Sequence, residues 1–245
     1  MKEHNVIFGR NPVIEALRSG RQVEKILVSS SEGSVRQIAA MAKEKSIPVI
    51  KTERKAIDRL SGGVSHQGVA AFTGAYGYAS WQDVLDRAES SGEEPFVIIL
   101  DGLEDPHNLG AIMRTAECAG AHGIIVPKRN SCGLTETVAK TSAGAVEYMP
   151  CVLVTNIGRT VEELKEQGFW TAACDMGGQE YYKADLTGRL AVVIGGEGHG
   201  ISRLVREKCD FVVSMPMKGR ITSLNASNAA AVIMYEVRRQ RDGKR

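Results

Sequence analysis

No apolar run in the 245-residue sequence approaches the roughly 20 residues that a membrane-spanning helix needs, so no membrane association is expected. The first residues carry no long apolar core, so no signal peptide is expected either. Cysteine is scarce, and no two cysteines form a C-x-x-C pair. An odd, dispersed set of thiols is typical of a reduced cytoplasmic protein and argues against disulfides or a zinc site. The five thiols belong to Cys118, Cys132, Cys151, Cys174 and Cys209.

Fingerprints of metal and nucleotide binding are also missing. The five histidines show no H-E-x-x-H or comparable ligand spacing, so no metal is expected. The glycine-rich run from Gly196 is no dinucleotide fingerprint, because Ile201 stands where the third glycine of G-x-G-x-x-G belongs. It is no P-loop either, because Ile201 and Ser202 follow Gly200 in place of Lys and Ser/Thr. A nicotinamide oxidoreductase is therefore a disfavoured alternative.

Neither sign of charge dominates, since the formal net charge is only +2. The charge is unevenly distributed, however. Residues 1–75 hold 12 Lys/Arg against 7 Asp/Glu, a net of +5, and residues 76–245 hold the remaining 19 against 22, a net of −3. The basic excess favours an RNA-facing role for the N-terminal part, with ordinary solubility charge as an equally good explanation.

With 43% hydrophobic and 24% charged residues, the chain is an ordinary globular protein with room for two domains. The first 75 residues alternate between helix and strand patterns and predict a small α/β domain. Residues 76–95 break this pattern with Gly, Ser, Pro and acidic residues around a short helix at 81–88, and they predict a linker. The elements expected in the first domain are helices over 11–20, 35–45 and 53–60 and strands over 23–28, 48–50 and 68–72.

The remaining residues, 96–245, predict a parallel sheet of about six strands covered by helices. The strand patterns are continuously apolar, which indicates burial on both faces. Asn225 stands before the last helical pattern as a good N-cap. The expected strands cover 96–100, 123–126, 148–154, 169–174, 190–194 and 211–215, and the expected helices 108–119, 135–143, 161–167 and 226–240.

Two loops follow the last two strand patterns. The first holds four glycines and Glu197, and the second holds Ser223 and Asn225. Carboxyl ends of parallel strands meet at one edge of a sheet, where α/β proteins bind their ligands. Glycines there let the backbone come close to a ligand. Taken singly, the glycine run also fits a plain turn, and Ser223 and Asn225 also fit helix caps.

Three motifs follow one another along the second half of the chain. They are Asp105-Pro-His-Asn-Leu-Gly-Ala-Ile-Met-Arg-Thr-Ala116 with Gly120, Val193-Ile-Gly-Gly-Glu-Gly-His-Gly200 running on to Pro216, and Ser223-Leu-Asn-Ala-Ser227. In kind and order they resemble the motifs of the SpoU/TrmH-type RNA ribose 2'-O-methyltransferases, which belong to the knotted SPOUT class and use S-adenosylmethionine. Met215 before Pro216, where an aliphatic residue is common, is a small departure.

The resemblance implies a fold and an assembly. The C-terminal α/β domain is expected to carry a parallel sheet and a trefoil knot, and it is expected to be preceded by a small α/β domain similar to ribosomal protein L30e that binds the RNA substrate. A homodimer is expected, in which the second subunit helps to complete the site.

The resemblance also implies site residues. Asn108, Arg114, Glu197, Ser223 and Asn225 match the catalytic positions. Arg114 is expected to act as a general base or to hold the phosphate and stabilise the developing 2'-oxygen; an arginine keeps its proton at physiological pH, which suits the second role at least as well. The positions that match S-adenosylmethionine binding are Gly195, Gly196, Met215 and Leu224, and no metal is implied.

The implied activity is S-adenosylmethionine-dependent 2'-O-methylation of a ribose, most consistent with a guanosine of large-subunit (23S) ribosomal RNA. A transfer-RNA methyltransferase of the same family is the nearest alternative, and the separate N-terminal α/β domain argues against it. A catalytically inactive RNA-binding protein is a second alternative, disfavoured because the five catalytic-site positions are all retained.

Overall fold

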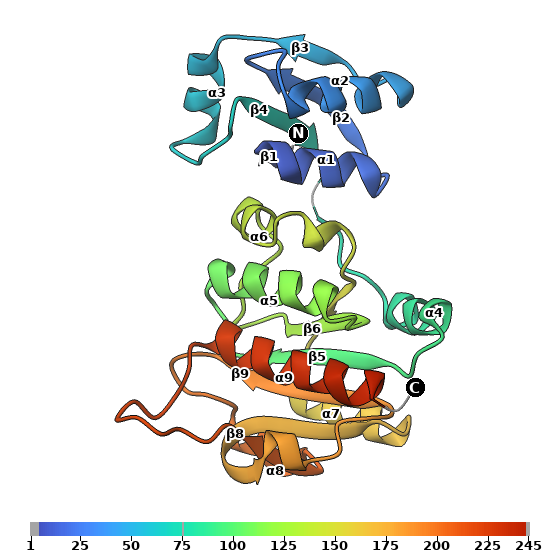
Figure 1. Ribbon diagram of the computed structural model, residues 1–245, viewed down its shortest axis with the longest axis vertical. Helices are drawn as coiled ribbons and strands as arrows, with labels where there is room; N and C mark the ends of the chain where they lie inside the picture. The colour runs from blue at the N-terminus through green and yellow to red at the C-terminus, as the bar shows by residue number, and fades with distance from the viewer. Residues whose placement is uncertain (1–4, 75, 244–245) are drawn as a thin grey trace. The chain divides into compact units, whose positions relative to one another are not determined.

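The computed structural model describes residues 5–74 and 76–243 and separates into two compact units (Figure 1). The first unit contains the residues up to Gly77 together with Leu134–Tyr148, and the second contains the rest. The first unit therefore includes a segment from the second half of the sequence. No helix in the described ranges is long and apolar enough to cross a bilayer.

The first unit is built on a mixed sheet with the strand order β1-β4-β2-β3. Strand β4 runs antiparallel to both of its neighbours, and β2 and β3 run parallel. Strand β1 was not among the expected elements, because its four residues are too few to show a period. The elements are β1 (Asn5–Phe8), α1 (Arg10–Arg18), β2 (Val23–Val28), α2 (Ser34–Glu44), β3 (Val49–Lys51), α3 (Arg54–Ser61) and β4 (Val69–Thr73).

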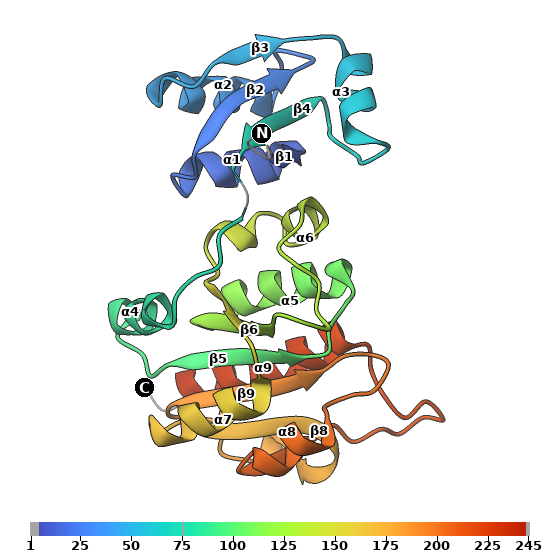
Figure 2. The same ribbon diagram turned by 180° about the vertical axis from the view of Figure 1, so that it is seen from behind.

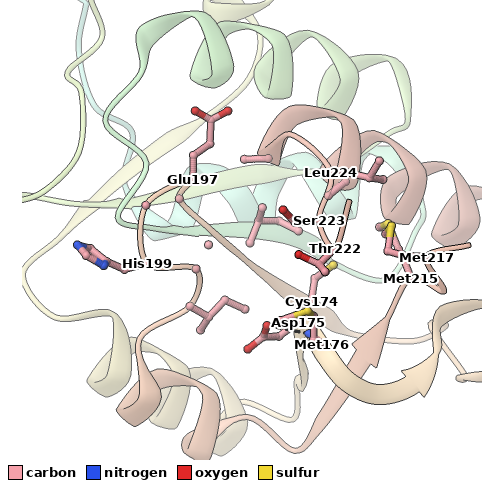
Figure 3. Close-up of a pocket in the computed structure, with 18 residues that line it drawn as sticks. Cys174, Asp175, Met176, Glu197, His199, Met215, Met217, Thr222, Ser223 and Leu224 are labelled. Carbon is pink, nitrogen blue, oxygen red and sulfur yellow. Dashed lines mark hydrogen bonds between the residues drawn. The ribbon is translucent and has the colours of Figure 1, made fainter. Parts of the chain in front are cut away.

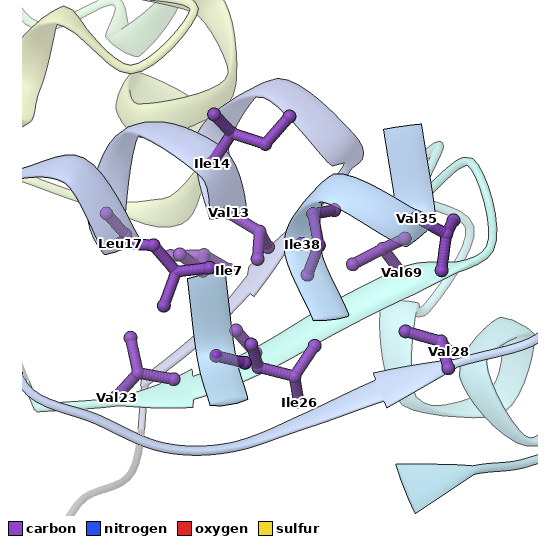
Figure 4. Packing of buried hydrophobic residues seen from close by; sticks show 13 residues of the cluster. Ile7, Val13, Ile14, Leu17, Val23, Ile26, Val28, Val35, Ile38 and Val69 are labelled. Atoms are coloured by element: carbon purple, nitrogen blue, oxygen red, sulfur yellow. The ribbon is translucent and has the colours of Figure 1, made fainter. Parts of the chain in front are cut away.

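Apolar side chains at helical spacing hold the first unit together. Val13 and Leu17 lie on one face of α1 and are fully buried, and Ile38 of α2 and Ile26 of β2 meet them in the same cluster (Figure 4). A fully buried aliphatic side chain contributes roughly 1.5–3 kcal/mol relative to an exposed one. The pattern explains why the helices and strands of this unit could be predicted from the sequence.

The segment Leu134–Tyr148 packs against α1 and the turn that follows it. The Tyr148 hydroxyl donates to Glu15 Oε2 at 2.6 Å, and Arg21 forms an ion pair with Glu147 at 2.7 Å. Both side chains of this ion pair are at least nine-tenths buried, so the pair is shielded from solvent. The segment consists of α6 (Glu136–Thr141) followed by a short 3-10 helix, Ala145–Glu147.

The second unit contains a sheet of six parallel strands within the described residues, in the order β10-β8-β9-β5-β6-β7. Helices α7 and α8 cover one face, and α5 and α9 pack against each other on the opposite face (Figures 1 and 2). The strands are β5 (Phe96–Asp101), β6 (Gly123–Pro127), β7 (Cys151–Val154), β8 (Trp170–Glu180), β9 (Leu190–Gly195) and β10 (Phe211–Ser214); the helices are α5 (Pro106–Cys118), α7 (Ile157–Glu166), α8 (Arg203–Lys208) and α9 (Ala226–Asp242).

The stretch predicted as a linker contains α4 (Trp81–Ser91), which belongs to the core of the second unit. Val84 is fully buried in the cluster beneath α7 and α8, and Trp81 packs on Phe169 with ring centroids 5.7 Å apart. The Trp81 indole also donates to Gln167 Oε1 at 2.9 Å. Charged residues on its outer face gave this helix the composition of a linker.

His122 is a buried histidine just before β6, only 2% exposed. Its Nδ1 accepts the backbone N–H of Phe96 at 2.9 Å, and its Nε2 lies 3.1 Å from the hydroxyl of Ser91. That hydroxyl already donates to the carbonyl of Ala88, so it accepts from His122, whose proton is on Nε2. Burial, reinforced by the charge of Arg241, lowers the pKa of His122 to about 4.

We expect the free energy of unfolding to decrease as the pH falls from about 6.5 to about 4. In this range His122 is protonated in the unfolded state, whereas its lowered pKa keeps it neutral in the folded state. Above pH 6.5 both states carry a neutral ring and the contribution is constant. The loss amounts to at most about 3 kcal/mol. Urea unfolding of wild type and His122→Asn at pH 7.5, 5.5 and 4.5 measures it, since asparagine keeps an acceptor near Nδ1 without titrating. Parallel losses in both proteins would contradict the prediction.

Candidate active site

A cavity of about 390 Å³ opens at the carboxyl edge of the parallel sheet, where β9 and β10 end beside the middle of β8 (Figure 3). The loops after β9 and β10 face each other across it, as the sequence predicted. Sites for small organic ligands are concave, largely apolar and typically about 300–1,000 Å³ in volume. The walls come from residues 174–176 of β8, residues 194–201, Met215, Met217, and residues 222–224, 226 and 229.

The two glycines predicted to bind a cofactor are required by the packing of the loops themselves. A Cβ on Gly195 would overlap the backbone of Gly200 and Ile201, and a Cβ on Gly196 would overlap the carbonyl of Gly102. The backbone N–H of Gly196 donates to the carbonyl of Asp101 at 2.8 Å. The loop after β9 thus lies directly against the loop after β5, and both glycines still present backbone to the cavity.

Met215 and Leu224, the other two predicted cofactor positions, also line the cavity. Met215 follows β10, and Leu224 stands just before α9, with 43% of its surface exposed. Together with Ile194, Ile201 and Ala226 they give the cavity an apolar wall suited to a flat aromatic ring. Ser223 lines the same cavity, so all the predicted positions in this loop except Asn225 contribute to it.

Asn108, Glu197 and Asn225 form a closed triangle of hydrogen bonds. Asn108 Nδ2 donates to Glu197 Oε1 at 2.9 Å, and Asn225 Nδ2 donates to Asn108 Oδ1 at 3.1 Å. Asn225 Nδ2 also contacts Glu197 Oε1. The three residues come from the start of α5, the loop after β9 and the start of α9, which are far apart in sequence. The structure therefore brings together three of the five predicted catalytic residues.

Each member of the triangle has a fixed orientation. Asn108 is 5% exposed, and its amide uses both ends in the triangle. Asn225 Oδ1 caps α9 by accepting the backbone N–H groups of Ser227 at 3.0 Å and Asn228 at 3.4 Å. Because Oδ1 is engaged as an acceptor by the helix, the Nδ2 of Asn225 is left to face Asn108 and Glu197.

A second cavity, of about 640 Å³, adjoins the first and shares the residues from Glu197 to Gly200 with it. Asn108 lines this second cavity, and Glu197 lines both, so the triangle lies at the wall between two hollows. The other walls come from the loop between β5 and α5, residues 101–105, and from Asn130 and Ser202. One space beside the triangle can hold a small molecule and the other a second reactant.

Arg114, the fifth predicted catalytic residue, lies apart from the triangle within one chain. Six residues advance the helix by about 600°, which places Asn108 and Arg114 on different sides of α5. Asn108 is buried, whereas Arg114 is exposed and lines neither of the two cavities. Within one chain, Asn108 and Arg114 therefore do not line the same cavity.

The contribution of β8 to the cavity was not predicted from the sequence. Cys174, Asp175 and Met176 line it, and Asp175 forms an ion pair with Arg206 at 3.1 Å. Burial raises the pKa of the Cys174 thiol to about 12, so it is neutral and not a nucleophile. Asp175 directly follows the predicted strand 169–174, and an acidic residue in that place was the pattern that could have revealed it. In the described part of the chain, no group of three His, Cys, Asp or Glu side chains could hold a metal ion.

Family models match almost the whole chain. The model described as the SpoU rRNA Methylase family matches residues 95–235, and the model described as RNA 2'-O ribose methyltransferase substrate binding matches residues 6–79. A protein of Bacillus subtilis named as a TrmH family tRNA/rRNA methyltransferase is 48% identical over 244 residues, which cover 98% of each chain.

Solved structures agree with these matches. The SpoU methyltransferase AviRb of Streptomyces viridochromogenes, in complex with the cofactor AdoMet, superposes with a TM-score of 0.83 and 26% identity over 99% of this chain and 92% of that one. A TrmH/SpoU tRNA-modifying enzyme of A. aeolicus gives a TM-score of 0.56 with 26% identity and covers 66% of this chain and 85% of its own. These likenesses confirm the predicted fold class, a parallel-sheet α/β domain preceded by a small α/β domain.

Proposed function

The chain belongs to the SpoU family of RNA methyltransferases, and from that premise we propose that it methylates the ribose 2'-hydroxyl of a guanosine in large-subunit ribosomal RNA. S-adenosylmethionine is the methyl donor. The observation that carries this proposal is the triangle of Asn108, Glu197 and Asn225 at the wall between two adjoining cavities. The glycine-walled cavity is assigned to the donor and the adjoining one to the target nucleotide.

The residues of the first cavity fit S-adenosylmethionine. Met215 and Leu224 offer apolar contact to the adenine, and the backbone of Gly195 and Gly196 offers hydrogen bonds to polar edges. The carboxylates of Asp175 and Glu197 line the same space and favour the cationic groups of the donor. When bound, the donor supplies an already activated methyl group, so the reaction needs no metal.

The protein's own part is to place the 2'-oxygen and stabilise charge as it develops. We assign Asn108 and Glu197 to orientation of the loops around the reacting atoms, and Ser223 to a hydrogen bond with the RNA phosphate. Holding two reactants in line contributes several kcal/mol to lowering the barrier, and up to roughly 7–11 kcal/mol in favourable cases. The hydrogen bonds of the triangle keep these side chains in place before the substrate arrives.

Arg114 completes the site, in our proposal, from the second subunit of a homodimer. Its exposed position on α5 leaves the guanidinium free to reach a neighbouring chain. The adjacent helix α9 exposes Val232 and Tyr235, at 37% and 53%, on the same face of the sheet. An arginine keeps its proton, so we assign Arg114 to the RNA phosphate and the developing 2'-oxygen. The proton of the 2'-hydroxyl passes to water as the methyl group leaves the sulfonium of the donor.

Ribosomal RNA is favoured over transfer RNA by the N-terminal unit. This unit matches a substrate-binding family model, and the likeness to the tRNA-modifying enzyme of A. aeolicus leaves a third of the chain without a counterpart. A domain devoted to binding substrate suits a large RNA in which the target nucleotide is surrounded by other structure. Methylation of transfer RNA at the same site is the alternative, and the experiment below distinguishes it from methylation of ribosomal RNA.

Incubation with methyl-labelled S-adenosylmethionine and separate pools of ribosomal and transfer RNA is expected to label the large ribosomal RNA. We expect at least about tenfold more methyl groups per molecule there than in transfer RNA, because the discrimination is a difference in transition-state binding. Nuclease digestion should then locate the methyl group on one guanosine ribose. Preferential labelling of transfer RNA would overturn the choice of substrate, and labelling of neither pool would overturn the activity.

A further inference from the structure

A third cavity, of about 490 Å³, lies wholly within the N-terminal unit. Its walls come from the start of α1, the turn after β2, the start of α3 and Gln67, which lies shortly before β4. The proposed methyl-transfer site uses none of these residues. The lining residues are Arg10, Ser29, Ser30, Glu32, Gly33, Arg54 and Gln67.

Two guanidinium groups make the lining of this cavity positively charged. Arg10 is half-buried, and its Nε donates to the carbonyl of Gln67 at 3.2 Å, which fixes the stem of the side chain. The end of Arg10 lies over Gly33, where a Cβ would be 3.5 Å from Nη1. Arg54 enters from the first turn of α3. Within the described ranges, neither arginine has a carboxylate within 4.0 Å, so both charges are available to a ligand.

Neutral donors accompany the two charges. Ser30 follows β2 and lines the cavity, and its hydroxyl is not used in any bond within the described chain. Ser29 is anchored, since its hydroxyl donates to the carbonyl of Gly68 at 3.3 Å. Two arginine forks and a hydroxyl at one small cavity match the oxygens of a phosphate group, which arginine binds with two parallel hydrogen bonds. Glu32 is the single acid on the lining and opposes such a ligand.

We propose that this cavity holds a backbone phosphate of the substrate RNA, bound by Arg10, Arg54 and Ser30. The inference rests on the proposed function in one respect, that RNA is the substrate, and it adds a binding site outside the catalytic unit. Phosphate contacts supply most of the affinity of proteins for nucleic acids and fix their register without reading sequence. The site therefore positions the RNA, and its residues take no part in the chemistry.

The test compares Arg54→Ala with Arg59→Ala, which removes the same charge from the exposed far end of the same helix. The full-length protein is titrated against a labelled transcript of large-subunit ribosomal RNA at several concentrations of KCl. For Arg54→Ala we expect affinity to fall about five- to tenfold and the slope of log K against log salt to fall by about one. Arg59→Ala is expected to stay within about twofold of wild type. Glu32→Gln is expected to bind about two- to threefold more tightly.

Further variants keep the test decisive. Arg54→Lys retains the charge and should recover part of the affinity, and thermal melting checks that each variant is folded. At saturating RNA, Arg54→Ala should reach the wild-type methyl-transfer rate, because the site acts on KM and not on kcat. Equal RNA binding by the Arg54→Ala and Arg59→Ala variants would overturn the site. A second result would also overturn it: inorganic phosphate binds wild type but not Arg54→Ala, and both proteins bind RNA equally well. That result would mean that the cavity is a site for a free anion and not for RNA.

Failure of this inference is distinguishable from failure of the proposed function. Loss of RNA affinity in Arg54→Ala, in a protein that methylates no RNA pool, would support the phosphate site and refute the methyltransferase activity. Methylation of ribosomal RNA with unchanged affinity in Arg54→Ala would refute the phosphate site alone.

Discussion

Replacing Arg114 by alanine is expected to lower the rate of methyl transfer about 100- to 1,000-fold, because a preorganised charge beside a developing oxyanion is worth that much in other active sites. Affinity for S-adenosylmethionine should stay within about twofold of wild type, since Arg114 does not line the proposed donor cavity. Single-turnover rates with excess enzyme measure the chemical step, and calorimetric titration measures donor binding. If wild type methylates RNA and Arg114→Ala still binds RNA but no longer methylates it, the alternative of an inactive RNA-binding protein is refuted.

Mixed dimers test whether Arg114 acts across the subunit interface. Arg114→Ala and Asn108→Ala proteins are each expected to be inactive, but a mixed dimer combines an intact Asn108 from one chain with an intact Arg114 from the other. Random mixing should restore about a quarter of wild-type activity, because about half of the dimers are mixed and each has one complete site. A mixture as inactive as its components would show that the two residues act within one chain.

Arg114→Lys with full activity would show that the positive charge alone suffices, without the two parallel hydrogen bonds that a guanidinium can donate.

Much of the fold could be predicted because burial leaves a clear mark on the sequence. The continuous apolar runs of β5, β6 and β9 predicted a helix-covered parallel sheet, and that sheet is observed. The prediction missed β1 and ended β8 at Cys174, whereas β8 continues to Glu180. Its last residues are polar or glycine and owe their strand conformation to pairing with β10 across an irregular register. Tertiary pairing of that kind leaves no local pattern.

The site was predictable in parts for a similar reason. Asn108, Glu197 and Asn225 follow or precede elements of one parallel sheet, so motif positions and strand order together bring them near each other. The rotation of α5 between Asn108 and Arg114 follows from helix geometry and could have been computed from the sequence. The contribution of Arg114 to the site of a partner chain could not be predicted from helix geometry, because an exposed arginine has the same sequence pattern in a monomer and at an interface. The trefoil knot came from the resemblance alone, and it and the domain boundaries remain predictions.

Replacing Gly196 by alanine is expected to weaken S-adenosylmethionine binding by at least about a hundredfold, or ~2.8 kcal/mol. The added methyl would overlap the carbonyl of Gly102, a backbone atom that cannot rotate away. To relieve the overlap, the loop after β9 must separate from the loop after β5. That movement breaks the hydrogen bond from Gly196 N–H to Asp101 and shifts Glu197, which lines both cavities. Calorimetric titration with the donor measures the loss.

Gly198→Ala is the matched control for this substitution. Gly198 lies in the same loop, and a Cβ there would meet no atom of the chain within 4 Å. Its thermal midpoint should therefore stay within about 2 °C of wild type, whereas Gly196→Ala should melt several degrees lower. A Gly196→Ala protein with wild-type donor affinity and melting temperature would mean that the two loops separate at little cost. In that case the close contact of backbones would not be what shapes the donor cavity.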